Sequence, residues 1–275
     1  MIERTFHTPG PLRLDFTIPA GEIDVETVDG EETHVELEAD DEAALDDAHV
    51  ELRERAGGHE VVVEIGRRRG LFGGMITIAI GGFSVGGTRY RLRVRTPRGA
   101  ELAVQTAAAD VQARGSYRST EIKAVSGDVT VDEVAGDAAV TTTSGDVRLR
   151  SAGGDLTLKT VSGDARVEHV GGTATVQTVS GDMKVADLGS SVTAKSVSGE
   201  LELNVREGEV SLTSVSGDVR VGIQPGSRVD VDASSVSGDL RSELELGDVP
   251  TEGDGPVVVL RGKTVSGDFK VVRAS

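Results

Sequence analysis

The tripeptide Ser-Gly-Asp, once Ser-Gly-Glu, recurs through the second half of the chain and constrains its fold more than any other feature. Its serines are Ser126, Ser144, Ser162, Ser180, Ser198, Ser216, Ser237 and Ser266. The first six stand 18 residues apart, and the last two intervals are 21 and 29 residues. A register kept over five consecutive intervals indicates stacked repeats, each too small to bury its own apolar face.

Each 18-residue repeat contains two turns and two short strands. A second, weaker turn signal follows nine residues after each turn glycine, at Gly136, Gly154, Gly172, Ser190 and Gly208. Between the turns apolar residues stand two apart, as Val147 and Leu149 do, which puts them on one face of a strand. The predicted fold class is therefore all-β: a flattened parallel β-solenoid, or β-helix, of 18-residue coils whose two sheets enclose an aliphatic core.

A valine stands immediately before most of the Ser-Gly turns. We expect these valines to close the core at the corner of each coil; they are Val125, Val161, Val179, Val197, Val215, Val236 and Val265.

Residues 1–98 are predicted to form an irregular N-terminal β cap, and residues 99–275 the solenoid, with a loop insertion near 243–258 that shields its other end. The two parts are expected to form one continuous structural unit. Candidate strands in the cap are Leu12–Ile18, Thr33–Ala39, His49–Arg55, Glu60–Ile65 and Arg89–Thr96, with a hairpin turn at Gly57–His59. Gly21 to Val25 repeats the pattern of a turn followed by alternation, so we interpret it as a degenerate coil.

The order of these segments resembles a known family. An N-terminal β segment is followed by Arg-Thr-Pro-Arg-Gly-Ala-Glu-Leu (Arg95 to Leu102) and then by runs of Thr-Val-Ser-Gly-Asp-Val at 18-residue spacing. This arrangement is similar, over essentially the whole chain, to the bacterial domain family of unknown function labelled "putative adhesin". The resemblance implies a Ser-Gly-Asp repeat solenoid without a known activity, in a family with some relatives linked to cell-envelope stress responses.

Composition excludes several function classes. The chain has 46 acidic and 29 basic side chains, a formal net charge of −17, which argues against an electrostatic grip on nucleic acid. Aromatic residues make up only 3%, too few for stacking platforms, and the absence of cysteine removes zinc-thiolate sites and thiol catalysis.

The N-terminus lacks the features of a signal peptide, and no stretch reaches eighteen apolar residues. We therefore expect a cytoplasmic protein without a transmembrane segment, able to associate with the inner face of the envelope.

The repeated acid is the sharpest candidate for chemistry. The acids should stack as one column: Asp128, Asp146, Asp164, Asp182, Glu200, Asp218, Asp239 and Asp268. Two residues later, on the same face, six of eight repeats have a basic residue: Arg148, Arg166, Lys184, Arg220, Arg241 and Lys270. We interpret the two sets as structural acidic and basic ladders. A calcium column is the alternative, although calcium β-rolls have turns of the form G-G-x-G-x-D, which these turns lack.

Other patterns indicate surface rather than catalysis. The hydroxyl column Thr157, Thr175, Thr193 and Ser211 resembles an ice-binding file, but Lys159 and Lys195 interrupt its neighbouring column. The histidines show no metal-ligand spacing, and no nucleophile motif or phosphate loop is present. The segment Glu22–Asp47 contains thirteen acids and no Lys or Arg, and we interpret it as a solvated β edge.

The uncharged segment Leu71–Thr88 is predicted to be a buried hairpin of the cap or, alternatively, an exposed partner-contact loop. In the second case the contacting side chains would be Leu71, Phe72, Met75, Ile78 and Phe83.

Together these patterns favour a non-enzymatic β-solenoid scaffold or binding module that needs no cofactor and no metal. Its expected partner is an unknown protein or envelope component, and self-association through the solenoid ends is a further prediction. Two alternatives stay open: a divergent carbohydrate-active β-helix enzyme and a calcium-binding β-roll-like protein.

Overall fold

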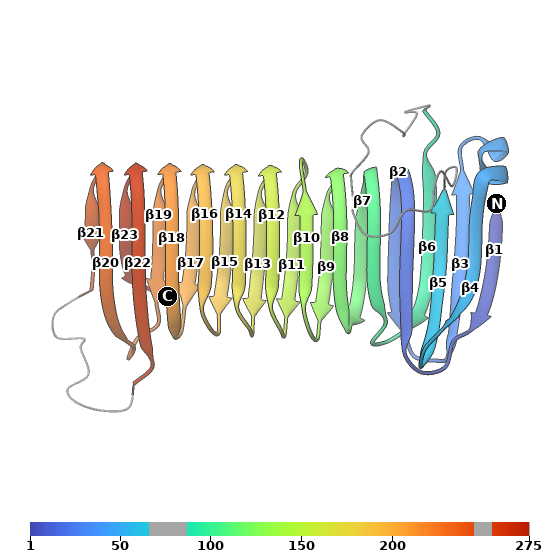
Figure 1. Ribbon diagram of the computed structural model, residues 1–275, viewed down its shortest axis with the longest axis horizontal. Helices are drawn as coiled ribbons and strands as arrows, with labels where there is room; N and C mark the ends of the chain where they lie inside the picture. Colours follow the sequence, from blue (N-terminus) through green and yellow to red (C-terminus); the bar gives the residue numbers. More distant parts are fainter. Residues whose placement is uncertain (66–86, 245–254, 275) are drawn as a thin grey trace.

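A computed structural model describes residues 1–65, 87–244 and 255–274 as a long, flattened stack of strands (Figure 1). One short 3-10 helix, η1 (Glu42–Asp47), interrupts the strands near the N-terminus. In chain order the strands are β1 (Ile2–His7), β2 (Leu12–Val28), β3 (Glu32–Ala39), β4 (Ala48–Arg55), β5 (Gly58–Ile65), β6 (Tyr90–Pro97), β7 (Glu101–Tyr117), β8 (Ser119–Ser126), β9 (Val129–Val134), β10 (Ala138–Thr142), β11 (Val147–Ala152), β12 (Leu156–Ser162), β13 (Ala165–Val170), β14 (Ala174–Ser180), β15 (Met183–Leu188), β16 (Val192–Ser198), β17 (Leu201–Val205), β18 (Gly208–Ser216), β19 (Val219–Ile223), β20 (Arg228–Ser237), β21 (Leu240–Ser242), β22 (Val257–Ser266) and β23 (Phe269–Arg273).

The repeat produces two layers of parallel strands. Layer 1 contains the first strand of each coil, running β8, β10, β12, β14, β16 and β18, and layer 2 contains the second, running β9, β11, β13, β15, β17 and β19. The long strands β2 and β7 each pass through both layers, so each forms a coil of its own. The predicted parallel β-solenoid is therefore confirmed.

The core consists of the alternating aliphatic side chains. Val185 and Leu203, which hold the same position in successive coils, are paired in register and fully buried.

Two structural features require glycine in each Ser-Gly-Asp turn. Gly163, for example, has a φ of +118°, and a Cβ added to it would lie 2.3 Å from the carbonyl oxygen of Gly145 in the preceding coil.

The predicted role of the valines before these turns is wrong. Val161, Val179, Val197, Val215 and Val265 are 45–50% exposed, Val236 is 83% exposed, and Val125 is half-buried. In β12 the alternation continues without a break to the residue before the valine, so Thr160 points inward and Val161 outward. A hydroxyl suits the inner corner because it can donate to the turn, as Thr160 Oγ1 does to the carbonyl oxygen of Ser162 at 3.3 Å.

The N-terminal part folds back around β2. Strands β5 and β6 pair with the two halves of β2 on the side opposite β7, and β4, β3 and β1 add antiparallel strands beyond them. All five candidate strands of this region are present, and β4 and β5 form the expected hairpin, with Arg55 opposite Gly58. The prediction that Glu22–Asp47 forms a β edge is wrong, because β2 and β3 both have neighbours on each side and the edge strands at this end are β1 and β4.

At the C-terminal end the spatial order of the coils departs from the chain order. Strands β22 and β23 lie between the β18–β19 coil and the β20–β21 coil, so the penultimate coil in sequence is the outermost in space (Figure 1). All of these pairings remain parallel. The predicted shielding loop near 243–258 falls largely on residues 245–254, outside the described residues.

In the inserted β22–β23 coil, a large side chain in one layer compensates for a missing side chain in the other. Gly262 stands in the core column between Leu212 and Ala233, and the ring of Phe269 fills the space, since a Cβ on Gly262 would lie 2.5 Å from Phe269 Cε2. The column that contains Phe269 has Val219 in the preceding coil. Phe269 and Gly262 together therefore fill the space that Val219 and Leu212 fill in the preceding coil.

Leu203→Asp should unfold the middle of the solenoid, because an unpaired carboxylate in this core costs several kcal/mol, on the order of 3 or more. Thr213→Asp, at an outward position of the next coil, is the matched control and should be nearly neutral. Urea unfolding of both variants provides the test, and equal stability would contradict the register.

Gly262→Leu should destabilise the protein by about 1–3 kcal/mol through overpacking, and Phe269→Val by a similar amount through the cavity it leaves. The double variant should recover most of the loss, because it restores two medium side chains. A double-mutant cycle measures this coupling; strictly additive losses would show that the two sites do not share one space.

Candidate functional site

The eight repeated acids lie in one column along the corner of the solenoid, and most of its aspartates accept a backbone hydrogen bond from the next coil. The N–H of Asp146 donates to Asp128 Oδ1 at 2.9 Å, and the N–H of Asp164 donates to Asp146 Oδ1 at 3.1 Å. The column begins one coil earlier than the sequence analysis placed it, at Asp110, which accepts from the N–H of Asp128. We call this column the carboxylate–amide ladder.

The ladder follows the spatial order of the coils rather than the chain order. The N–H of Asp268 donates to Asp218 Oδ1, and the N–H of Asp239 donates to Asp268 Oδ1, at 2.9 and 3.0 Å. Each of these bonds joins Oδ1 of one carboxylate to the amide hydrogen of the next coil, and this hydrogen bonding lets the column tolerate closely stacked acids.

The predicted basic ladder lies beside this column but contributes to it unevenly. Arg148 pairs with Asp146 at 3.3 Å and Arg241 with Asp239 at 2.6 Å, each within its own coil. Lys184 instead pairs across coils with Glu202, at 2.8 Å. In the described part of the chain, Arg166, Arg220 and Lys270 form no ion pair.

Glu200 interrupts the ladder. Its N–H donates to Asp182 Oδ1 at 2.9 Å, yet no bond from the N–H of Asp218 to Glu200 is found among the described residues. The extra methylene of glutamate moves the carboxylate away from the position that an aspartate Oδ1 occupies.

The column offers little to a calcium ion. The Oδ1 atoms already accept backbone hydrogen bonds, and the described residues contain no group of three or more His, Asp or Glu arranged to hold a metal.

The second turn of the coils has a shorter column of the same kind of hydrogen bond. The N–H of Asp155 donates to Asp137 Oδ1, that of Thr173 to Asp155 Oδ1, and that of Glu209 to Ser191 Oγ.

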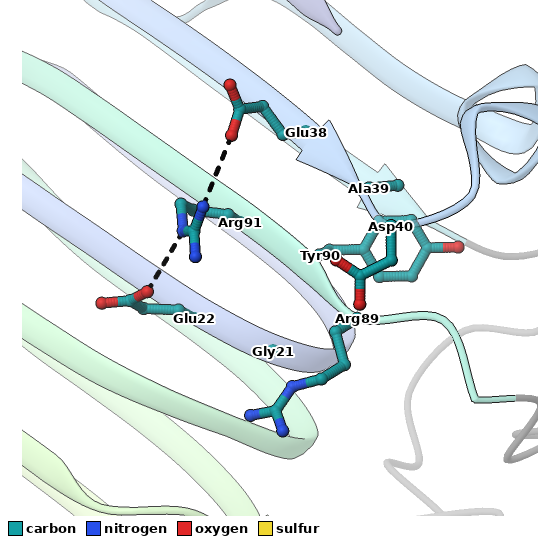
Figure 2. A pocket seen from close by; sticks show the side chains of 8 residues that line it. All are labelled: Gly21, Glu22, Glu38, Ala39, Asp40, Arg89, Tyr90 and Arg91. Atoms are coloured by element: carbon teal, nitrogen blue, oxygen red, sulfur yellow. Dashed lines mark hydrogen bonds and ion pairs between the residues drawn. The ribbon is translucent and has the colours of Figure 1, made fainter.

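The acidic segment near the N-terminus lies beside β6, which has an arginine at every second position. The sequence did not predict this pairing. In register, Glu22, Arg91 and Glu38 stand side by side on β2, β6 and β3, and Arg91 lies 3.3 Å from Glu22 and 3.7 Å from Glu38 (Figure 2). This triplet lines a depression of about 260 Å³ that also contacts Tyr90. Burial raises the pKa of Tyr90, and Asp47 and Asp41 add to the shift.

A second, larger depression of about 420 Å³ lies over the same strands, where Arg93, Arg95 and Arg114 meet four acids. Arg114 binds Asp24 at 2.5 Å and Arg95 lies 3.8 Å from Glu26, so two of the three arginines are paired. Nearby, the buried Tyr117 hydroxyl donates to the carbonyl oxygen of Val25 at 2.8 Å. Burial raises the pKa of this phenol, which keeps it a hydrogen-bond donor and gives it a structural role.

One histidine belongs to a charged cluster on layer 2. His169 Nδ1 lies 3.0 Å from Asp187 Oδ2, and Arg206 binds the same carboxylate through two nitrogens. Burial would raise the pKa of Asp187, but the hydrogen bonds from Arg206 and His169 outweigh it and lower the pKa. The cluster joins the β13, β15 and β17 coils and leaves no carboxylate free to act as a base.

The hydroxyl column lies on the outer face of layer 1 in strict register, from Thr157 through Thr175 and Thr193 to Ser211.

The predicted partner-contact loop lies outside the described residues, as do all of its expected contact residues: Leu71, Phe72, Met75, Ile78 and Phe83. No helix of the described residues is long and apolar enough to cross a membrane.

Glu200→Asp should restore the missing bond of the ladder and stabilise the protein by about 0.5–1.5 kcal/mol, the usual net value of a hydrogen bond. Glu168→Asp is the control, because Glu168 is exposed on layer 2 and takes no part in the ladder. Denaturant midpoints of both variants give the comparison. A gain no larger at Glu200 than at Glu168 would show that the interruption has no energetic cost.

Comparison with known proteins gives a family and several similar structures. Among curated proteins none matches the chain. Solved structures that resemble it include three described as a "putative adhesin". The one from Bacteroides fragilis NCTC 9343 is 10% identical over 98% of this chain and 96% of that one, with a TM-score of 0.45. Those from Parabacteroides merdae ATCC 43184 and Parabacteroides distasonis ATCC 8503 are 12% and 13% identical, cover 99% and 98% of this chain and 96% of their own, and have TM-scores of 0.40 and 0.42. The family model described as Toastrack DUF4097 matches residues 14–272, and the chain therefore belongs to that family.

Proposed function

We propose that this protein is a non-enzymatic β-solenoid that serves as a scaffold or binding module, adhesin-like in the sense used for its structural neighbours, and that it works at the bacterial cell envelope. Residues 1–98 act in this proposal as the cap that ends the stack on one side. Binding takes place on the broad faces of the solenoid and needs no cofactor.

The observation that carries the proposal is the even distribution of side chains along the axis. Acids, hydroxyls and valines each recur once per coil, whereas an enzyme gathers different groups at one place. In the depression beside Tyr90, Arg91 is paired with both Glu22 and Glu38, and neither carboxylate stands alone as a base. A repeated face suits a ligand that is itself extended or repeated.

Co-sedimentation of the full chain with isolated wall and membrane fractions of the source bacterium tests this function. Two matched variants each add two negative charges to one face: Gln177→Glu with Thr213→Glu on layer 1, and Thr130→Glu with Ala186→Glu on layer 2. All four positions point outward. We expect saturable retention on one fraction, reduced at least about fivefold by one pair and unchanged by the other.

Two results would contradict the proposal. Absence of retention on both fractions would remove the binding role, and release of soluble sugars from the wall fraction by the purified protein would establish an enzyme instead.

A further inference from the structure

One row of lysines on the outer face of layer 1 repeats with twice the period of the fold. Its members are Lys123, Lys159, Lys195 and Lys263, and they stand on every second strand: β8, β12, β16 and β22. The strands between them hold uncharged polar residues in the same register, Thr141, Gln177 and Thr213. Neighbouring strands are about 4.8 Å apart, so the ammonium groups recur about every 10 Å along a row about 29 Å long.

The exchange of coils at the C-terminal end keeps this alternation intact. If β20 had followed β18 in space as it does in sequence, Ser234 would stand next to Thr213 and Lys263 would lie one strand farther away, which would break the alternation. Because β22 is inserted, Lys263 follows Thr213, and Ser234 follows Lys263. The row therefore spans two segments of chain that are far apart in sequence.

Three of these lysines differ from the cations of layer 2 in the residues beside them. Each cation of the basic ladder stands two residues after an acid, as Arg148 does after Asp146, although Arg166, Arg220 and Lys270 form no ion pair in the residues that the structure describes. Lys184 has a carboxylate, Glu202, on the next strand, whereas Lys159, Lys195 and Lys263 have hydroxyl or amide neighbours and form no ion pair within the described residues. Lys123 is bound to Glu121 at 2.5 Å. Alternation with neutral groups limits repulsion between the lysines but leaves their charge available to a ligand.

Between β10 and β22 the strands that hold the row place no acid directly beside a lysine; beyond them, Asp232 on β20 stands in register with Arg261 and diagonally to Lys263. From β12 to β18 the lysines have the hydroxyl column on one side and the exposed valines on the other, and neither adds a carboxylate, in a protein of net charge −17. Glu209, at the start of β18, is paired with Arg261 at 2.5 Å. The face thus presents hydroxyls, unpaired cations and an apolar strip side by side.

We infer that this face binds an extended acidic polysaccharide in which charged and neutral sugars alternate; this inference rests on the proposed binding function. Acid groups one disaccharide apart match the spacing of the lysines, the intervening sugars meet Thr and Gln, and sugar C–H faces contact the valines. Duplex nucleic acid fits poorly, since each of its strands carries one phosphate about every 3.4 Å of helix axis. A lipid surface requires no fixed spacing, because its headgroups diffuse freely.

The test measures binding of the full chain to hyaluronate, whose carboxylates occur once per disaccharide, by biolayer interferometry at low and physiological salt. Neutral dextran, and vesicles of phosphatidylcholine and phosphatidylglycerol in equal parts, are the comparison ligands. The variant K159Q/K195Q/K263Q should weaken hyaluronate binding at least about tenfold, and added salt should weaken it further. The control R166Q/R220Q/K270Q makes the same change in net charge on layer 2 and should alter binding by less than about twofold.

A second variant tests the spacing itself. The exchange Q177K/K195Q keeps the net charge but moves one ammonium group by one strand, and it should weaken binding by roughly threefold or more. Thermal unfolding of each variant confirms that exposed substitutions leave the fold intact.

Equal losses from the two triple variants, an unchanged affinity after the exchange, or binding to the vesicles but not to hyaluronate would overturn the inference. If the lysine triple variant is still retained by the envelope fraction and hyaluronate does not bind, only the polysaccharide inference fails and the binding module remains. If envelope retention is absent as well, the proposed function fails with it.

Discussion

Parallel backbone hydrogen bonding between similar coils is the interaction on which the rest of this structure depends. Once Val167 pairs in register with Leu149, every side chain acquires a neighbour at the same position one strand away. Leucine over valine is favourable, whereas acid over acid is not. The aspartates are tolerated because their carboxylates accept the amide hydrogen of the next coil, which places stacked acids in a network of hydrogen bonds.

The corner of each coil shows how this constraint selects residue types. The turn glycine must combine a positive φ with close contact to the preceding coil, and the inward position before the exposed valine takes a hydroxyl that can reach the turn carbonyl, as Thr160 and Ser196 do. The valine then faces solvent because the alternation leaves it no other direction. Because the inward position at the corner is taken by a hydroxyl residue, the valines that follow form an apolar strip on the surface, where they are available for binding.

The sequence predicts the regular part of the fold well, because an 18-residue period and two-residue alternation determine which residues share a face. It also predicts the N-terminal strands, whose alternation is independent of what they pair with. It does not predict the strand order at either end. The pairing of β2 with β6 brings Glu22 beside Arg91, and the insertion of β22 and β23 brings Gly262 against Phe269, but neither match has a signal in the linear spacing of these residues. For the same reason the lysine row could not be recognised beyond Lys195, since Lys263 joins it only through the spatial order.

The inserted coil has a consequence for how the molecule is made. Strand β20 contacts β22 rather than its predecessor in the chain, so the β20–β21 coil has no place to dock when it first leaves the ribosome. The growing chain must hold that segment undocked until Val257 to Arg273 have also emerged and paired with β18 and β19. Elongation of the solenoid can proceed coil by coil during synthesis as far as β19, but the last two coils must then dock in the reverse of the order in which they are translated.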